Sequence, residues 1–99
     1  MAKYDVYENQ DGQGYLLEVQ SDLLEGLNTR IVVPLLLQHT APKPARFLNP
    51  IFEVNNQQVV METHLLAAVP LSILVSPVTE LSQQFDEITR ALDMLFQGF

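Results

Sequence analysis

The stretch Arg30-Ile31-Val32-Val33-Pro34 is the strongest strand signal in this sequence of 99 residues. Three consecutive β-branched side chains suit a pleated backbone and are disfavoured in a helix. Because the proline that follows them has no backbone N–H, we expect it at the end of the strand, where the missing hydrogen bond does least harm. The stretch therefore predicts β-structure in the first half of the chain.

Two hairpins are predicted on either side of this strand. Residues 4–8 and 15–20 flank a turn with two glycines and an aspartate, which supply turn geometry. Residues 51–54 and 58–61 flank Asn55-Asn56, and asparagine tolerates the left-handed conformation that tight hairpin turns need. All these strands are expected to be short and antiparallel.

Prolines and glycines mark the segments between the strands. Residues 23–28 are expected to form a loop that pivots on its glycine. Residues 36–50 contain three prolines, so we expect a long surface excursion rather than a helix or a central strand. Residues 68–75 predict a further strand, in which Pro70 implies an edge position or a bulge. The pair Ser76-Pro77 is then expected to end the sheet.

An amphipathic helix is predicted at the end of the chain, because apolar residues recur there at spacings of four and three. This apolar stripe consists of Leu81, Phe85, Ile88, Leu92 and Leu95. We expect the helix to begin at Ser82, whose hydroxyl can cap it, with Asp86 and Glu87 in the first turns, where negative charge is favoured. A start at Ser76, with Pro77 in the first helical position, is the alternative.

These elements predict one domain over residues 1–99, mainly β with one C-terminal α-helix. The expected architecture is a strongly curved antiparallel sheet or open barrel with the helix packed against it. A chain of this length buries about two thirds of the surface that its unfolded form exposes, which is enough for a single core.

Charge and composition restrict the classes of partner. Twelve acidic and five basic residues give a net charge of −7, and the basic residues are scattered along the chain. Nucleic-acid binding draws most of its affinity from Lys and Arg that neutralise phosphates, so we expect a protein partner and no direct nucleic-acid binding. With 47% hydrophobic and only 17% charged residues, apolar surface should remain exposed, which favours an oligomer.

The sequence also limits location and metal binding. It contains no cysteine, so neither a disulfide nor a thiolate metal site is expected. The start, Met1-Ala2-Lys3-Tyr4-Asp5, lacks the apolar segment of a signal peptide, and no run reaches the ~18 apolar residues of a membrane span. We therefore expect a cytoplasmic protein that does not bind a membrane.

No catalytic constellation is recognisable. His39 and His64 have no second histidine at metal-ligand spacing. The stretch Glu62-Thr63-His64 offers candidate ligands, but successive side chains on a strand face opposite ways. We therefore interpret both histidines as structural or solvated, and we expect no enzyme, no metal and no cofactor.

The final stretch, Ala91-Leu92-Asp93-Met94-Leu95-Phe96-Gln97-Gly98-Phe99, carries a candidate contact surface. Phe96 and Phe99 fall outside the helical stripe, so we expect a contact surface hinged by Gly98; the alternative is that both rings fold back into the core. The loop pair Leu23-Leu24 is a second candidate contact or, alternatively, a core plug that closes one end of the barrel.

Six ordered blocks of this sequence resemble the CcdB family, the toxin half of a bacterial toxin–antitoxin pair. The blocks are Tyr4-Asp5-Val6-Tyr7, Val19-Gln20-Ser21-Asp22-Leu23-Leu24, Asn28-Thr29-Arg30-Ile31-Val32-Val33-Pro34-Leu35, Ala68-Val69-Pro70-Leu71-Ser72-Ile73, Glu80-Leu81-Ser82 and Phe96-Gln97-Gly98-Phe99. Their order and spacing agree over essentially the whole chain, apart from residues 36–50.

The resemblance implies an SH3-like barrel with a C-terminal helix, shared with the MazF and Kid toxins, and a homodimer with its helix tips near the two-fold axis. It implies a toxin that binds the gyrase A subunit, traps the cleaved complex of DNA and DNA gyrase, and is neutralised by a CcdA-like antitoxin. The gyrase-binding residues carried over by position are Lys3, Tyr4, Tyr7, Ser21, Leu23, Leu24, Asp93, Phe96, Gln97, Gly98 and Phe99.

Three positions depart from well-known members of the family: Gln97 replaces a tryptophan, Phe99 an isoleucine and Asp93 an asparagine. A glutamine cannot stack on an arginine of the target as a tryptophan does. Two alternative functions follow. One is a homologue that binds the antitoxin and helps to repress their shared operon without poisoning. The other is a MazF-like endoribonuclease, which needs a basic groove, and Arg30 is the only cation in a predicted strand.

Overall fold

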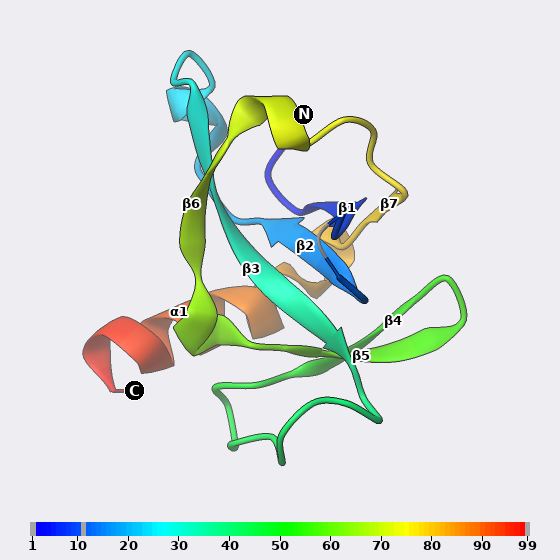
Figure 1. Ribbon diagram of the computed structural model, residues 1–99. Helices are drawn as coiled ribbons and strands as arrows, with labels where there is room; N and C mark the ends of the chain where they lie inside the picture. Colours follow the sequence, from blue (N-terminus) through cyan, green and yellow to red (C-terminus); the bar gives the residue numbers. More distant parts are fainter. Residues whose placement is uncertain (1, 11, 99) are drawn as a thin grey trace.

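The structure, a computed structural model, describes residues 2–10 and 12–98 (Figure 1). These residues contain seven strands and one α-helix. In chain order they are β1 (Asp5–Glu8), β2 (Tyr15–Glu18), β3 (Thr29–Leu37), β4 (Ile51–Val54), β5 (Gln57–Met61), β6 (Ala67–Pro70), β7 (Thr79–Glu80) and α1 (Phe85–Gln97). Within this part of the chain no helix has the length and apolar character needed to cross a membrane.

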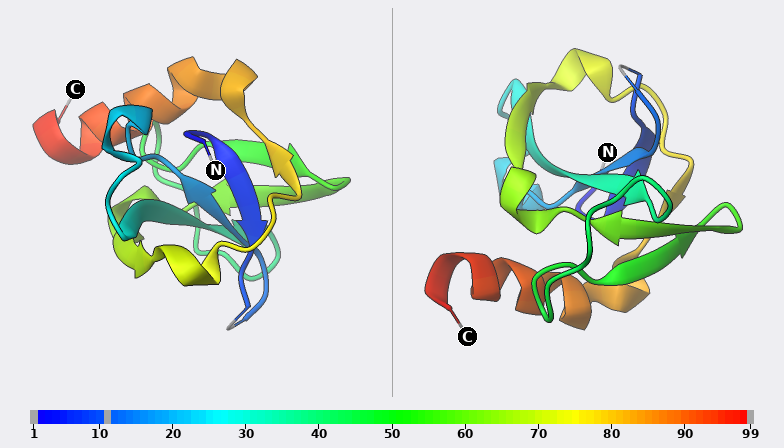
Figure 2. Two further views of the ribbon diagram at one scale, coloured as in Figure 1. Left: turned by 90° about the horizontal axis from the view of Figure 1, so that it is seen from above. Right: turned by 60° about the horizontal axis from the view of Figure 1, so that its bottom comes forward.

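The strands form one antiparallel sheet with the order β4-β5-β3-β2-β1-β7. The long strand β3 is its centre, because it pairs with β2 along one edge and with both β5 and β6 along the other. The sheet curves into a nearly closed barrel, and α1 lies across one side of it (Figure 2). The predicted fold class, mainly β with one C-terminal helix, is confirmed.

Both predicted hairpins are present, since β1 pairs with β2 and β4 pairs with β5. Asn55 and Asn56 have φ angles of 51° and 65°, the left-handed pair that a two-residue hairpin turn needs. The excursion predicted over residues 36–50 starts later than expected, because β3 runs through Leu37. Its far end is fixed by Asn49, whose side-chain amide donates to the carbonyl oxygen of Met61 at 2.9 Å.

The sequence wrongly placed the end of β3 at Pro34. The carbonyl oxygen of Pro34 accepts the N–H of Glu62 at 2.9 Å, so an N–H at Pro34 would face the same edge of β3. At this edge β3 changes partner, pairing with β6 before Pro34 and with β5 after it. The proline is tolerated inside the strand because the ladder is interrupted there.

The strand predicted over residues 68–75 is cut short. β6 ends at Pro70, and the 3₁₀ turn Leu71–Ile73 follows it. In the described part of the chain β6 pairs with β3 alone, which confirms the predicted edge position. Neither the end of the sheet nor a helix start lies at Ser76-Pro77, because β7 returns to pair with β1.

The predicted helix start at Ser82 is also wrong. Ser82–Gln84 is a 3₁₀ turn, and α1 follows directly after it. The Ser82 hydroxyl does not cap the helix; the Ser82 N–H instead donates to the carboxylate of Glu80 at 2.8 Å. Asp86 and Glu87 lie in the first turn of α1, as expected.

The apolar stripe of α1 reaches the core through Ile88 and Ala91, which are fully buried, and it is extended by Leu81. These residues pack in one cluster with strand residues such as Leu17 and Val33. Phe85, predicted to share this stripe, is 50% exposed. The preceding 3₁₀ turn has three residues per turn instead of 3.6, so the face set by Leu81 does not continue through Phe85.

Candidate functional site

An apolar cleft of about 350 Å³ brings together the two segments that the sequence predicted as contact surfaces. Ser21 and Leu24 line it from the loop after β2, and Leu92 and Phe96 line it from the last turns of α1. The other lining residues are Val19, Gln20, Ile31 and Leu66. Figure 2 shows the loop and the C-terminal end of α1 on the same side of the sheet.

The loop between β2 and β3 holds its leucines outside the core. Leu23 is 94% exposed, and about half of the surface of Leu24 and Leu27 is exposed. The alternative reading of Leu23-Leu24 as a plug of the barrel is therefore wrong. Exposed aliphatic side chains gathered beside an apolar cleft are typical of a contact surface.

Polar contacts, not apolar burial, shape this loop. The turn Asp22–Leu24 is a 3₁₀ helix, and the Ser21 Oγ that caps it accepts the N–H of Leu23 at 3.2 Å. The carboxylate of Asp22 accepts the N–H of Lys3 at 2.8 Å. This bond brings the start of the chain beside the loop, so two more of the predicted site segments are neighbours.

Tyr4 has a strained backbone next to this junction. Its φ angle of 78° is rare for a bulky residue and costs about 1–3 kcal/mol. Hydrogen bonds on both sides hold it, from its N–H to the carbonyl oxygen of Glu18 (2.8 Å) and from the N–H of Leu81 to its own carbonyl oxygen (2.9 Å). The ammonium group of Lys3 lies 5.2 Å from the centroid of the Tyr4 ring.

The tip of α1 presents Phe96, which is 69% exposed, and the neighbouring Gln97 is exposed too. Phe96 therefore does not fold back into the core. Phe99, the second predicted aromatic contact, lies outside the described residues.

Gly98 ends the helix in a fixed conformation. Its φ angle is 82°, and its N–H donates to the carbonyl oxygens of Asp93 (3.2 Å) and Met94 (3.1 Å). This is a left-handed C-cap, which glycine adopts without steric cost. The sequence predicted a hinge here, and the two hydrogen bonds indicate a rigid helix end instead.

Of the predicted site residues, Ser21, Leu24 and Phe96 line the cleft, whereas Tyr7 and Asp93 have different surroundings. Tyr7 is only 1% exposed, so its ring cannot touch a partner of the folded chain. Asp93 lies around a different hollow of α1, together with Phe85 and Arg90. Any effect of Tyr7 on binding must therefore be indirect.

A buried polar network lies beneath the loop. The hydroxyl of Tyr7 donates to Oε1 of Glu18 at 3.3 Å, and Oε2 of Glu18 lies 3.5 Å from Nε of Arg30. Burial raises the pKa of the Glu18 carboxyl above its ordinary value, although the Arg30 charge and the Tyr7 hydrogen bond oppose this shift. Burial, followed by the Glu18 charge, also raises the pKa of the Tyr7 hydroxyl.

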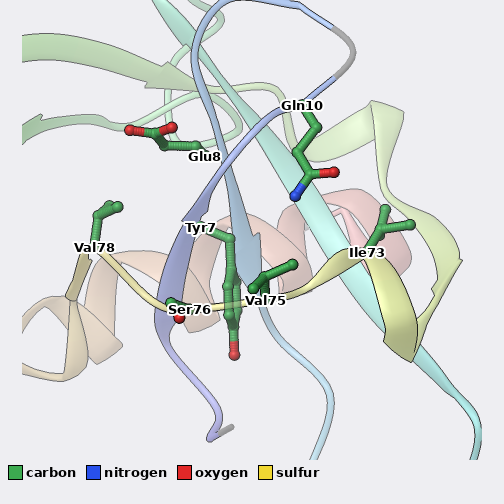
Figure 3. A pocket seen from close by; sticks show the side chains of 7 residues that line it. All are labelled: Tyr7, Glu8, Gln10, Ile73, Val75, Ser76 and Val78. Carbon is green, nitrogen blue, oxygen red and sulfur yellow. The ribbon is translucent and has the colours of Figure 1, made fainter.

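A second hollow, of about 280 Å³, lies over Tyr7. Figure 3 shows Val75 and Ser76 in the segment that passes over the Tyr7 ring, with Ile73 and Val78 on either side. Apart from Tyr7 itself, none of the residues predicted to bind a partner lines this hollow. It is therefore separate from the cleft.

The histidines lie apart from the cleft. His39 and His64 are exposed, and Nε2 of His64 is 3.9 Å from Oε1 of the buried Glu62. Over residues 2–10 and 12–98, no three His, Asp or Glu side chains are grouped so that they could hold a metal ion.

Several residues around the cleft were not predicted as part of a site. Leu27 had a readable signal, because it is the third leucine of one short loop between two strands. Ile31 and Leu66 had none, since only the pairing of β3 with its neighbours decides which way they face. Arg30 was noticed only as a possible catalytic cation, and its contacts with the loop could not be read from the sequence.

Two comparisons with known proteins show what this chain is similar to. A family model described as "CcdB protein" matches residues 3–98. A solved structure titled "Endoribonuclease in complex with its cognate antitoxin from Mycobacterial species" is similar with a TM-score of 0.77 and 13% sequence identity. The alignment covers 97% of this chain and 94% of that one. At this identity the likeness shows the shared fold alone.

Proposed function

We propose that this chain, which belongs to the CcdB family of toxins in toxin–antitoxin systems, poisons DNA gyrase by binding the gyrase A subunit and trapping the cleaved DNA–enzyme complex. A CcdA-like antitoxin is the partner expected to neutralise it. The structurally similar endoribonuclease was solved with its own antitoxin, which supports a partner of this kind.

The observation that carries the proposal is the cleft between the loop and the tip of α1. Leu24 and Phe96 face it from two distant parts of the chain, and Leu23 stands exposed beside it. Aliphatic and aromatic anchors surrounded by polar groups are the usual composition of a binding hot spot. The polar residues that line the cleft are the exposed Ser21 and the buried Gln20.

We also propose that the chain is not an enzyme. An endoribonuclease needs an accessible cation to stabilise its transition state. Arg30 is only 3% exposed, and its guanidinium donates to the backbone carbonyl oxygens of Glu25 and Leu27 in the loop and of Thr29 at the start of β3. Arg30 could reach RNA only if the loop came apart. The net charge of −7 further disfavours RNA binding.

We place the protein in the cytoplasm, where gyrase acts, as a homodimer without metal or cofactor. Apolar side chains outside the cleft support an oligomer, since Val75 is 70% and Leu65 51% exposed. Because Gln97 replaces the tryptophan of well-known family members at the helix tip, a second function is the alternative. An antitoxin-binding homologue that regulates its operon without poisoning would keep the fold and lose the gyrase contact.

Expression of the full chain in gyrase-sensitive bacteria tests the proposal. Growth arrest with accumulation of covalent gyrase–DNA complexes is the expected result, and co-expression of the neighbouring antitoxin gene should relieve it. Arrest with degraded RNA and no gyrase–DNA complexes would favour the ribonuclease. No arrest from a protein that is shown to be folded would favour the non-poisoning homologue.

A further inference from the structure

The leucines of the loop after β2 are exposed, so other contacts must keep them out of the core. All residues from Ser21 to Thr29 are exposed, so the loop gains little from apolar burial. A loop with three leucines, Leu23, Leu24 and Leu27, would otherwise lower its free energy by turning them inward. We call residues 22–28 the leucine loop.

Arg30 holds the leucine loop from below. Its Nη1 donates to the carbonyl oxygens of Leu27 (2.6 Å) and Thr29 (2.9 Å), and its Nη2 donates to that of Glu25 (2.7 Å). These bonds use both ends of the planar guanidinium, which a lysine ammonium cannot reproduce. The arginine therefore fixes the second half of the loop by its backbone.

Arg30 is itself held by the buried Glu18, which is held in turn by the buried Tyr7. Its Nε lies 3.5 Å from Oε2 of Glu18, and the other carboxylate oxygen of Glu18 accepts the hydroxyl of Tyr7. A buried charge without a partner is costly, so each group fixes the position of the next. Through this series the fully buried Tyr7 is connected to the exposed loop.

Gln20 anchors the first half of the loop in the same way. Its side-chain amide donates to the carbonyl oxygens of Leu24 (3.3 Å) and Thr29 (3.2 Å), and its side-chain oxygen accepts the N–H of Ile31 (3.0 Å). Loop carbonyl oxygens of Leu24, Glu25 and Leu27 are thus held by Gln20 and Arg30, which lie on either side of the loop in the sequence.

We propose that Tyr7, Glu18 and Arg30 are positioning residues, which hold the leucine loop preformed for the partner that docks at the cleft. The inference rests on the proposed binding role of the cleft. It assigns an indirect role to Tyr7, which family resemblance placed among the contact residues although its ring is buried. Preformation removes the cost of ordering the loop at the moment of binding.

Hydrogen exchange on the purified chain tests the positioning without any partner. The N–H groups of Leu24, Glu25 and Leu27 make hydrogen bonds within the loop. In Arg30→Lys and Tyr7→Phe, their exchange should become at least tenfold faster, whereas strand amides of β2 and β3 should keep their rates. Arg90→Lys, an exposed arginine on α1, is the matched control and should change none of them.

Binding to a purified fragment of the gyrase A dimerisation region gives the second readout. Arg30→Lys should lower the association rate and weaken affinity about tenfold, with Glu18→Gln acting in the same direction. Unchanged loop exchange in both Arg30→Lys and Tyr7→Phe would overturn the proposal, as would faster loop exchange with full binding. If wild type itself does not bind gyrase, the proposed function fails, while the exchange data still decide whether these residues hold the loop.

Discussion

Leu24 and Phe96 line one apolar cleft, although the first belongs to the loop after β2 and the second to the last turn of α1. The two segments can line the same cleft because the barrel places the loop and the tip of the helix on one side of the sheet (Figure 2). A partner that fills the cleft would touch both segments at once. Substitutions in either segment should therefore weaken the same binding event.

Leu23→Ser should reduce gyrase binding without affecting the fold. Because Leu23 is 94% exposed, its loss should change the free energy of unfolding by no more than about 0.5 kcal/mol. Loss of an apolar anchor at an interface should lower the affinity at least about tenfold. Isothermal titration with the gyrase A fragment and urea unfolding measure the two effects. Val75→Ser, at a 70% exposed valine outside the cleft, is the control and should bind at full strength.

Gly14→Ala should destabilise the protein, because Gly14 closes the first hairpin at a φ angle of 93°. A β-carbon there would also overlap the carbonyl oxygen of Leu35 on β3. Strain of this kind costs about 1–3 kcal/mol, which thermal unfolding detects as a drop of several degrees in Tm. Gly26→Ala is the control, since nothing lies within 4 Å of its β-carbon position, and it should leave Tm nearly unchanged. Equal Tm values for the two variants would contradict the structure.

The pKa of Glu18 predicts a pH-dependent stability. Burial raises this pKa in the folded protein above the ordinary value of 4.5, so between the two values the folded state binds more protons than the unfolded chain. The free energy of unfolding should therefore fall as the pH rises through the folded pKa. Glu18→Gln lacks this titration, so wild type should lose stability relative to the variant as the pH rises above 4.5 in urea unfolding.

A second titrating group acts in the opposite direction but cancels in this comparison. Hydrogen bonds from Ser82 lower the pKa of the exposed Glu80, so its contribution is lost only as the pH falls below 4.5. Wild type and Glu18→Gln both contain Glu80, so its titration contributes equally to the stability of each. If wild type instead gained stability over Glu18→Gln as the pH rose, pairing with Arg30 would outweigh burial, and the assigned direction of the Glu18 shift would be wrong.

A homodimer is expected because the low charge content leaves apolar side chains on the surface. Sedimentation equilibrium at micromolar concentration should give twice the chain mass of 11.2 kDa. A single species of chain mass under those conditions would contradict the dimer. Phe96→Ala serves as a comparison, since a changed mass would place the helix tip at the dimer axis.

The parts of the fold that the sequence predicted correctly are those that local chemistry decides. Asn55-Asn56 specifies a tight turn by its own backbone preference, and Ile88 reaches the core through helical spacing. Pro34 and Ser82 were misplaced because their roles depend on distant partners. Pro34 is tolerated within β3 only since two other strands meet beside it, and the Ser82 N–H is capped by a carboxylate that precedes it.

The candidate site shows the same division. Exposure of Leu23 and Phe96 was predicted, because neither fits the spacing of a strand or of the helical stripe. The burial of Tyr7 was not predicted. Alternation along β1 does not reveal that residues 73–78 cover the face of the sheet that carries Tyr7 (Figure 3). The contacts of Arg30 with the leucine loop depend on tertiary structure that no local pattern encodes.

Removal of Gln97, Gly98 and Phe99 should abolish gyrase binding and leave the core intact. The buried residues of α1 end well before this segment, so within the described residues the main structural loss is the C-cap of Gly98 on the carbonyl oxygens of Asp93 and Met94. Phe96 would then lie in a frayed last turn and lose its fixed position beside the cleft. We expect a decrease in Tm of only a few degrees, together with at least a tenfold loss of affinity.

Phe96→Ala separates the loss of the aromatic contact from the fraying of the helix end as causes of weaker binding. It keeps the helix end and removes only the 69% exposed ring, so it should cost no more than about 0.5 kcal/mol of stability and still weaken binding at least tenfold. Phe85→Ala is the matched control, a 50% exposed phenylalanine on the same helix that does not line the cleft. If Phe85→Ala weakened gyrase binding as much as Phe96→Ala, the docking surface would lie along the outer side of α1, away from the cleft.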